Sequence, residues 1–142
     1  MKRALSCAKK AAKIGEVPVG AVVVRNGEVV STGYNRRETD KNALRHAEIT
    51  AIDRACKKLG GWRLWECDLY VTLEPCPMCA GAIAMSGISR LIYGAVDAQY
   101  GCAGSVYRIT EDPAFHSYCP ADGGLFENEC ARLLEDFFRK RR

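Results

Sequence analysis

The chain alternates between stretches with the spacing of a helix and stretches with the spacing of a strand, and this alternation limits the folds open to it. Three helices are expected, at residues 3–14, 43–59 and 77–87. Two short apolar strands are expected after the second and third of these helices, at residues 67–73 and 89–96. Between the first two helices, two β-branched runs flank Arg25, Asn26 and Gly27, which predicts an antiparallel hairpin. The order predicts an α/β fold whose later strands are parallel and whose sheet has helices on both faces.

The last third of the chain has a weaker pattern. Residues 97–123 are rich in Gly, Pro, Ser and Asp, which predicts a short helix and an irregular loop, and a last helix is expected from Gly124 to Lys140. No repeat, low-complexity tract or linker divides the sequence, and 48% of its residues are hydrophobic. We therefore expect residues 1–142 to form a single domain with one packed core.

No apolar run approaches the roughly 20 residues that cross a bilayer, and the amphipathic, charged start MKRALSCAKKAAKIGE lacks the apolar centre of a signal peptide. These features predict a cytoplasmic protein without a membrane segment. Thiols stay reduced in the cytoplasm, so the 8 cysteines are expected to be buried small residues or metal ligands rather than disulfides.

Two short motifs stand at the starts of the second and third predicted helices. They are His46-Ala47-Glu48 and Pro75-Cys76-Pro77-Met78-Cys79. Such helix starts meet in the ligand crevice of an α/β sheet. One imidazole and two thiolates are three good zinc ligands, and a free fourth position is typical of a catalytic site. The helix starts are also expected to lower the pKa of both thiols.

Glu48 follows the histidine by two residues and so cannot share its helical face. It is expected not to bind the metal, but to take a proton from metal-activated water and return it to a leaving group.

Two other interpretations of the cysteine pair remain open. A redox dithiol is possible, although it would leave His46 and Glu48 without a role. A closed structural zinc site would need a fourth ligand from His116, Cys102 or Cys119. The six cysteines outside the pair are expected to be ordinary buried small residues, at positions 7, 56, 67, 102, 119 and 130.

The chain ends in Phe137-Phe138 followed by Arg139-Lys140-Arg141-Arg142. Four consecutive cations beside two aromatic rings could hold phosphates. The alternative is a solvated helix end whose cations complement the helix dipole.

The combination of H-x-E with P-C-x-x-C resembles the signature of zinc-dependent nucleobase deaminases. Within that group the chain resembles bacterial tRNA adenosine deaminases over nearly its whole length, in five stretches: VPVGAVVV (17–24), GYNR (33–36), HAE (46–48), LYVTLEPCPMCAGA (69–82) and ECARLLEDFFRKRR (129–142). The resemblance implies a three-layer α/β/α cytidine-deaminase-like fold with a mixed, mostly five-stranded sheet. It also implies a homodimer with one Zn²⁺ per subunit that hydrolytically deaminates adenosine to inosine at the wobble position of a tRNA anticodon.

The same resemblance assigns roles to individual residues. It implies that zinc is held by His46, Cys76 and Cys79 and that Glu48 shuttles the proton. It places Asn35 against the base and Asp97 near the ribose, although Asn35 could simply end a strand and Asp97 could cap a short helix after it. Further substrate contacts are implied for Ala47, Pro75, Phe138 and Arg139.

The sequence departs from the family pattern around this core. The stretch HSYCPADGG (116–124) replaces a basic, β-branched segment, Arg45 often has a small counterpart, and Gln99 and Tyr100 stand where a lysine and a small residue are common. These differences leave the substrate open. A free-base or nucleoside deaminase acting on guanine or cytosine is one alternative, and a non-catalytic zinc-binding or RNA-binding module is another, which Glu48 argues against.

Overall fold

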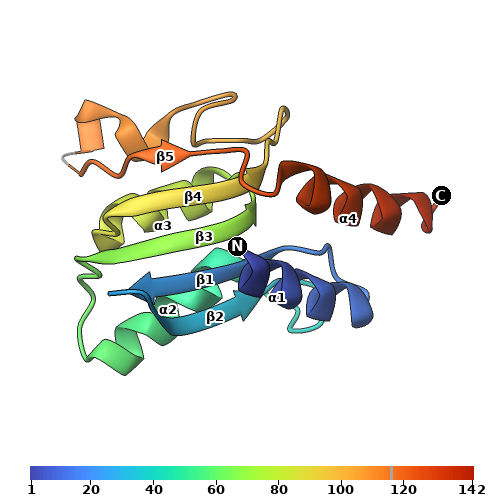
Figure 1. Ribbon diagram of the computed structural model, residues 1–142, viewed down its shortest axis with the longest axis horizontal. Coiled ribbons are helices and arrows are strands. Elements are labelled where there is room, and N and C mark those ends of the chain that lie inside the picture. The colour runs from blue at the N-terminus through green and yellow to red at the C-terminus, as the bar shows by residue number, and fades with distance from the viewer. Residues whose placement is uncertain (116) are drawn as a thin grey trace.

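One mixed five-stranded sheet organises the chain in the computed structural model, which describes residues 1–115 and 117–142 (Figure 1). Its strands lie in the order β2-β1-β3-β4-β5. Strand β1 pairs antiparallel with β2 and β3, whereas β3, β4 and β5 pair in parallel. The α/β class and the parallel later strands are therefore confirmed. The strands are β1 Gly20–Arg25, β2 Glu28–Tyr34, β3 Cys67–Leu73, β4 Arg90–Ala95 and β5 Ala121–Asp122.

The first two strands form the predicted hairpin. Arg25 pairs with Glu28, and the two residues between them, Asn26 and Gly27, both have positive φ, at 52° and 76°. Such a two-residue turn matches the right-handed twist of the strands, and asparagine and glycine adopt its left-handed backbone at low cost.

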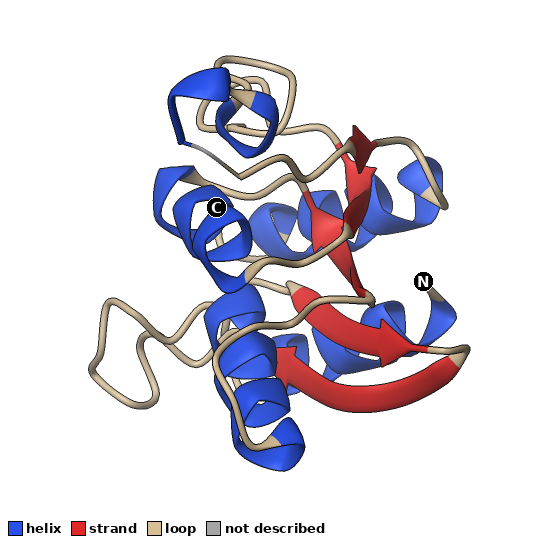
Figure 2. Cartoon of the chain, turned by 90° about the vertical axis from the view of Figure 1, so that its left-hand side faces the viewer, coloured by secondary structure: helices blue, strands red, loops and turns tan. Residues whose placement is uncertain are grey.

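Helices cover both faces of the sheet, as Figure 2 shows. Helices α1 (Lys2–Lys13) and α4 (Glu127–Arg139) contact each other on one face, and α2 (Ala47–Leu59) and α3 (Pro77–Ser86) contact each other on the opposite face. The three-layer α/β/α arrangement is therefore confirmed. Within the described part of the chain, no helix has both the length and the apolar character that a membrane crossing requires.

The sheet and helix α2 approach each other closely at Gly33 of β2. A side chain there would overlap the backbone of α2, at the carbonyl oxygen of Ala47 and the amide nitrogen of Ala51. The absence of a Cβ therefore lets the first turns of α2 lie directly against the strand.

The core lies between the sheet and its helices. Leu69 and Val71 of the central strand β3, Leu91 of β4 and Ile83 of α3 are fully buried. Five of the six cysteines outside the motif are buried as predicted, but Cys56 is only half-buried, so the prediction is wrong for that residue.

Helix α2 begins at Ala47 and not at residue 43, so the predicted start is wrong. The side-chain oxygen of Asn42 accepts a hydrogen bond from the amide of Leu44 at 2.9 Å, and the amide of His46 donates to the carbonyl oxygen of Leu44. His46 itself is extended, with φ −76° and ψ 155°, and forms the N-cap. The polar turn therefore occupies the first residues of the apolar pattern, and the helix starts only after this turn.

The segment 97–123 contains a strand that its composition does not predict. Two short 3₁₀ helices, Ile109–Glu111 and Pro113–Phe115, are followed by β5, which completes the sheet beside β4. A strand of two residues is too short to show a period. The last helix begins at Glu127 rather than Gly124 because Phe126 has a left-handed backbone, with φ 55°.

Candidate metal and substrate site

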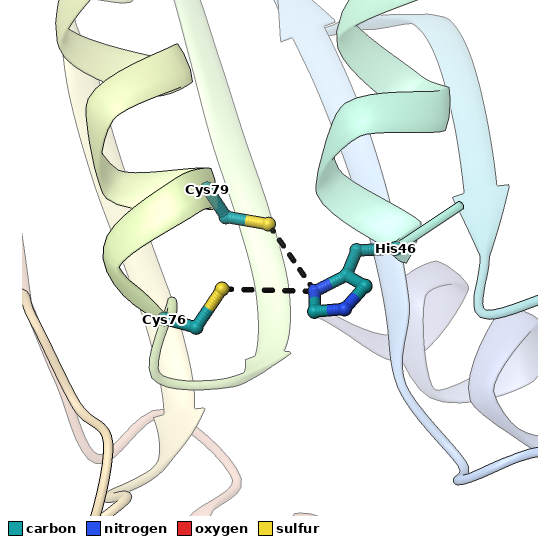
Figure 3. A group of neighbouring side chains, drawn as sticks. All are labelled: His46, Cys76 and Cys79. Carbon is teal, nitrogen blue, oxygen red and sulfur yellow. Dashed lines mark hydrogen bonds between the residues drawn. The ribbon is translucent and has the colours of Figure 1, made fainter. Parts of the chain in front are cut away.

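The starts of α2 and α3 bring three potential metal ligands together (Figure 3). His46 is the N-cap of α2, Cys76 is the N-cap of α3, and Cys79 lies in the first turns of α3. Nδ1 of His46 lies 3.7 Å from Sγ of Cys76 and 3.5 Å from Sγ of Cys79. The chain thus joins two motifs that lie about 30 residues apart in the sequence.

The spacing of these atoms fits a tetrahedral zinc ion. Zinc–sulfur bonds of about 2.3 Å and zinc–nitrogen bonds of about 2.0–2.1 Å, at a tetrahedral angle, separate nitrogen from sulfur by about 3.6 Å. Both observed separations are close to this value. Among the described residues no fourth His, Cys, Asp or Glu joins the cluster; Cys102 and Cys119 are buried but are not part of it, and His116 lies outside the described residues. The donor set therefore fits an open site better than a closed one.

Hydrogen bonds among the three ligands shift their pKa values. A hydrogen bond from Cys79 lowers the pKa of the Cys76 thiol to about 4, and the hydrogen bond with Cys76 raises the pKa of His46. The pKa of Cys79 is raised, first because its proton is held by Cys76 and then by burial. The expected lowering of the pKa is thus found for Cys76. For Cys79 the expectation is wrong, because a second thiolate beside the first would be repelled when no metal is bound.

Glu48 lies beside this cluster with only 4% of its surface exposed. Burial raises the pKa of its carboxyl to about 6. A carboxyl with a pKa near neutral pH can both accept and return a proton, which is what a general acid–base group needs.

A cavity of about 340 Å³ opens in front of the cluster. This size is in the range of small-molecule sites. The predicted residues Asn35, Ala47 and Asp97 line it, whereas Pro75 is not among its lining residues. The full lining is Val17, Val19, Asn35, Arg37, His46, Ala47, Glu48, Leu73, Glu74, Cys76, Asp97 and Tyr100.

Two predicted substrate residues are held in place by their neighbours. The side-chain amide of Asn35 donates to the carbonyl oxygen of Val17 at 3.3 Å. Oδ1 of Asp97 accepts hydrogen bonds from the amides of Gln99 and Tyr100, each at 3.0 Å. Residues 98–100 form a turn and not a helix, so the alternative that Asp97 caps a short helix is wrong: it closes a turn instead.

The sequence did not single out two other residues of the cavity. Arg37 supplies a cation, and its side chain is half exposed, while Tyr100 supplies an aromatic ring that is 60% exposed. In the sequence, Tyr100 was noticed only as a departure from the family pattern. Its position three residues after Asp97 was the feature that could have placed it at the cavity. Arg37 carried no signal beyond its place two residues after Asn35.

The C-terminal residues Phe138 and Arg139 are not among the residues that line this cavity. They line a separate surface groove with Leu134, Glu135 and Arg142, along the second half of α4 and the residues after it, at the C-terminal end of the chain (Figure 1). Arg139 pairs with Asp136, and the guanidinium of Arg141 lies over the Phe137 ring, so part of the basic tail has partners within the chain.

Comparison with known proteins agrees with this geometry. The family model of MafB19-like deaminases matches residues 1–142. A tRNA-specific adenosine deaminase of Bacillus subtilis is 46% identical over 142 residues, which span the whole chain and 88% of that protein. A solved structure from studies of A-to-I editing by tRNA:A34 deaminases at the wobble position superposes with a TM-score of 0.91 at 44% identity, covering 94% of the chain and 97% of the other. A guanine deaminase of Bacillus subtilis has a TM-score of 0.66 at 40% identity, covering 73% of the chain and 67% of the other.

Proposed function

The chain belongs to the MafB19-like deaminase family, and from this membership and the geometry of its site we propose that it hydrolytically deaminates adenosine to inosine at the wobble position of a tRNA anticodon. The observation that carries the proposal is the cluster of His46, Cys76 and Cys79 with the buried Glu48 beside it, at one wall of a cavity. A structural metal site has no use for such a carboxyl.

The residues divide the chemistry among them. His46, Cys76 and Cys79 would hold one Zn²⁺, which supplies hydroxide near neutral pH by lowering the pKa of water. Glu48 accepts one proton from water as the water oxygen adds to C6 of adenine, and passes it to the ring nitrogen. It then takes the second proton from the oxygen on C6 and passes it to the amino group, which departs as ammonia and leaves a carbonyl at C6.

The cavity walls orient the base. Val17, Val19 and Leu73 supply apolar surface, and the side-chain amide of Asn35 supplies a hydrogen-bonding group. A base reaches this cavity only after leaving its stack, as a nucleotide in an anticodon loop can. Ala47, Pro75 and Asp97 belong to the proposed substrate-binding set around the cavity.

The remaining features concern the rest of the RNA. We place Phe138 and Arg139 at the edge of the anticodon stem-loop, because the groove on α4 combines an exposed ring with cations.

The chain is one deaminase domain that works as a homodimer in the cytoplasm, where its tRNA substrate is found. A mass in solution of about twice 15.6 kDa checks the dimer.

The test is to incubate the zinc-loaded protein separately with total tRNA, free adenosine, guanine and cytosine. Inosine in tRNA, found by nucleoside mass spectrometry after digestion, and little ammonia from the free compounds are expected. Efficient release of ammonia from guanine would instead favour the alternative that the chain is a guanine deaminase, like the protein of one similar structure. If the zinc-loaded protein turned over none of the four substrates, both the tRNA deaminase proposal and this alternative would be contradicted.

A further inference from the structure

Glu74 is a buried carboxyl that the proposed chemistry does not use. It follows strand β3, precedes the zinc-ligand motif and is only 2% exposed. Its two oxygens accept four hydrogen bonds, all from the loop 97–105. The donors are the amide of Asp97 at 3.0 Å, the amide of Ala103 at 3.3 Å, and the amide and hydroxyl of Ser105 at 2.9 and 2.5 Å.

Two backbone hydrogen bonds also hold the end of β3, at Glu74 and Pro75, to the segments beside it. The amide of Glu74 donates to the carbonyl oxygen of Ala95 at 2.9 Å, and the carbonyl oxygen of Pro75 accepts from the amide of Cys102 at 2.9 Å. The loop also passes very close to the carboxyl, because a Cβ at Gly101 would overlap Oε2 of Glu74. The loop is therefore wrapped around this side chain.

The charge of Glu74 is stabilised by these donors. No ion pair with Glu74 is found among the described residues, and each of its oxygens accepts two of the four hydrogen bonds. Hydrogen bonds to a buried carboxylate are among the stronger ones in proteins. Although Glu74 reaches the cavity wall, both oxygens are occupied, so it is not available to bind a substrate or move a proton.

The loop that Glu74 holds carries Asp97 and Tyr100, which line the cavity. We propose that Glu74 is a positioning residue for substrate recognition: it fixes loop 97–105, and thereby the placement of Asp97 and the Tyr100 ring against the target nucleotide and its neighbour. This inference rests on the proposed function for its substrate, an RNA loop. The exposed ring of Tyr100 offers a surface on which a base beside the target can stack.

Glu74→Gln tests the role with little change of shape. In the wild type both carboxylate oxygens accept hydrogen bonds. A glutamine replaces one of these oxygens with an NH₂ group, which cannot accept a hydrogen bond, so some of the four are lost. The KM for a tRNA anticodon stem-loop is expected to rise about tenfold or more, with kcat changed by less than about threefold. Zinc content should stay at one per chain, and the amides of Asp97, Ala103 and Ser105 should exchange hydrogen faster.

Gly101→Ala disturbs the contact from the loop side, because its Cβ would overlap Oε2 of Glu74 and also the carbonyl oxygen of Asp97, and it should raise KM as well. Gly61→Ala is its matched control, because a Cβ at Gly61 meets no atom within 4 Å. Ser105→Ala, which removes only the hydroxyl donor, should give a smaller rise. If Glu74→Gln does not fold, the two loop variants still decide the question.

An unchanged KM in Glu74→Gln and Gly101→Ala would overturn the proposal. So would a fall in kcat alone, in proportion to a smaller folded fraction, because that is the result of a purely structural role. If wild-type protein fails to deaminate any tRNA loop, the proposed function is wrong. Hydrogen exchange then still reports whether Glu74 holds the loop, so the two failures can be told apart.

Discussion

Four side chains, His46, Glu48, Cys76 and Cys79, decide what the site can bind and which protons it can move. Without metal, Cys76 is a thiolate at neutral pH, since its pKa is lowered to about 4, whereas Cys79 keeps its proton. The hydrogen bond with Cys76 raises the pKa of His46, so its imidazole keeps a proton to higher pH than a free histidine does. A metal must therefore displace protons from Cys79 and His46, while Cys76 is ready to bind.

This protonation state predicts how zinc affinity depends on pH. Above the raised pKa of His46, binding should release about one proton, from Cys79; below that pKa it should release about two, because His46 is then protonated as well. The apparent affinity should consequently fall more steeply as the pH drops through the raised pKa of His46. Calorimetry in buffers of different ionisation enthalpy measures the proton count. A count that does not rise as the pH is lowered through the pKa of His46 would contradict its role.

Glu48→Gln should retain one zinc per chain and lose activity. The amide cannot carry the proton between water and the leaving amino group, so kcat should fall by about 10²–10⁴-fold. Metal analysis and single-turnover deamination measure the two properties. Glu28→Gln, at an exposed glutamate at the start of β2, is the control and should match wild type. Loss of zinc in Glu48→Gln would mean that Glu48 is a ligand.

At the scale of elements, the site depends on how α2 lies against β2 and contacts α3. His46 is held by the turn before α2, and Cys76 and Cys79 are held by the start of α3. The two N-termini must remain at a fixed distance for the nitrogen and sulfur atoms to stay about 3.6 Å apart. The close approach at Gly33 fixes the position of α2.

Gly33→Ala should therefore affect both stability and metal binding. Because the added methyl group meets helix backbone and not a movable side chain, we expect the free energy of unfolding of the metal-free protein to fall by about 1–3 kcal/mol. The displaced helix should also weaken zinc binding. Denaturant unfolding and competition with a chelator measure the two effects. Gly61→Ala should change neither, and a normal zinc affinity in Gly33→Ala would show that the position of α2 does not limit the site.

At the scale of the whole molecule, the cavity and the basic end of α4 are separate surfaces. The cavity has a volume of about 340 Å³, the size of a small-molecule site, whereas Phe138, Arg139 and Arg142 line a groove at the C-terminal end of the chain. A substrate that used both would have to be larger than a nucleoside. This arrangement favours an RNA loop over a free base.

Deletion of residues 139–142 should therefore weaken binding of an anticodon stem-loop and reduce its salt dependence. Each lost phosphate contact should lower the slope of log K against log salt by about 0.7. Deamination at saturating RNA should change little, because these residues do not line the cavity. The double change Lys57→Ala and Lys58→Ala, at the far end of α2, removes two cations and serves as the control. An unchanged slope would remove the tail from the RNA-binding surface.

The local patterns of the sequence were sufficient for the α/β class, the hairpin at Asn26-Gly27 and the grouping of His46 with Cys76 and Cys79. Each of these depends on short-range chemistry: turn residues with positive φ, the periods of strands and helices, and ligand types at helix starts. The alternation of helices and strands also predicted helices on both faces of the sheet. The family resemblance supplied the cytidine-deaminase-like fold with a mostly five-stranded sheet and the reaction, and the comparisons support both.

Long-range contacts account for what the sequence patterns missed. Strand β5 has two residues and exists because β4 offers it an edge, so no local period marks it. Arg37 and Tyr100 line the cavity because two loops distant in the sequence meet there. The proton shared between Cys76 and Cys79, and the burial that raises the pKa of Glu48, likewise require the packed structure, because desolvation and charge pairing depend on which atoms surround a group and not on its neighbours in the chain.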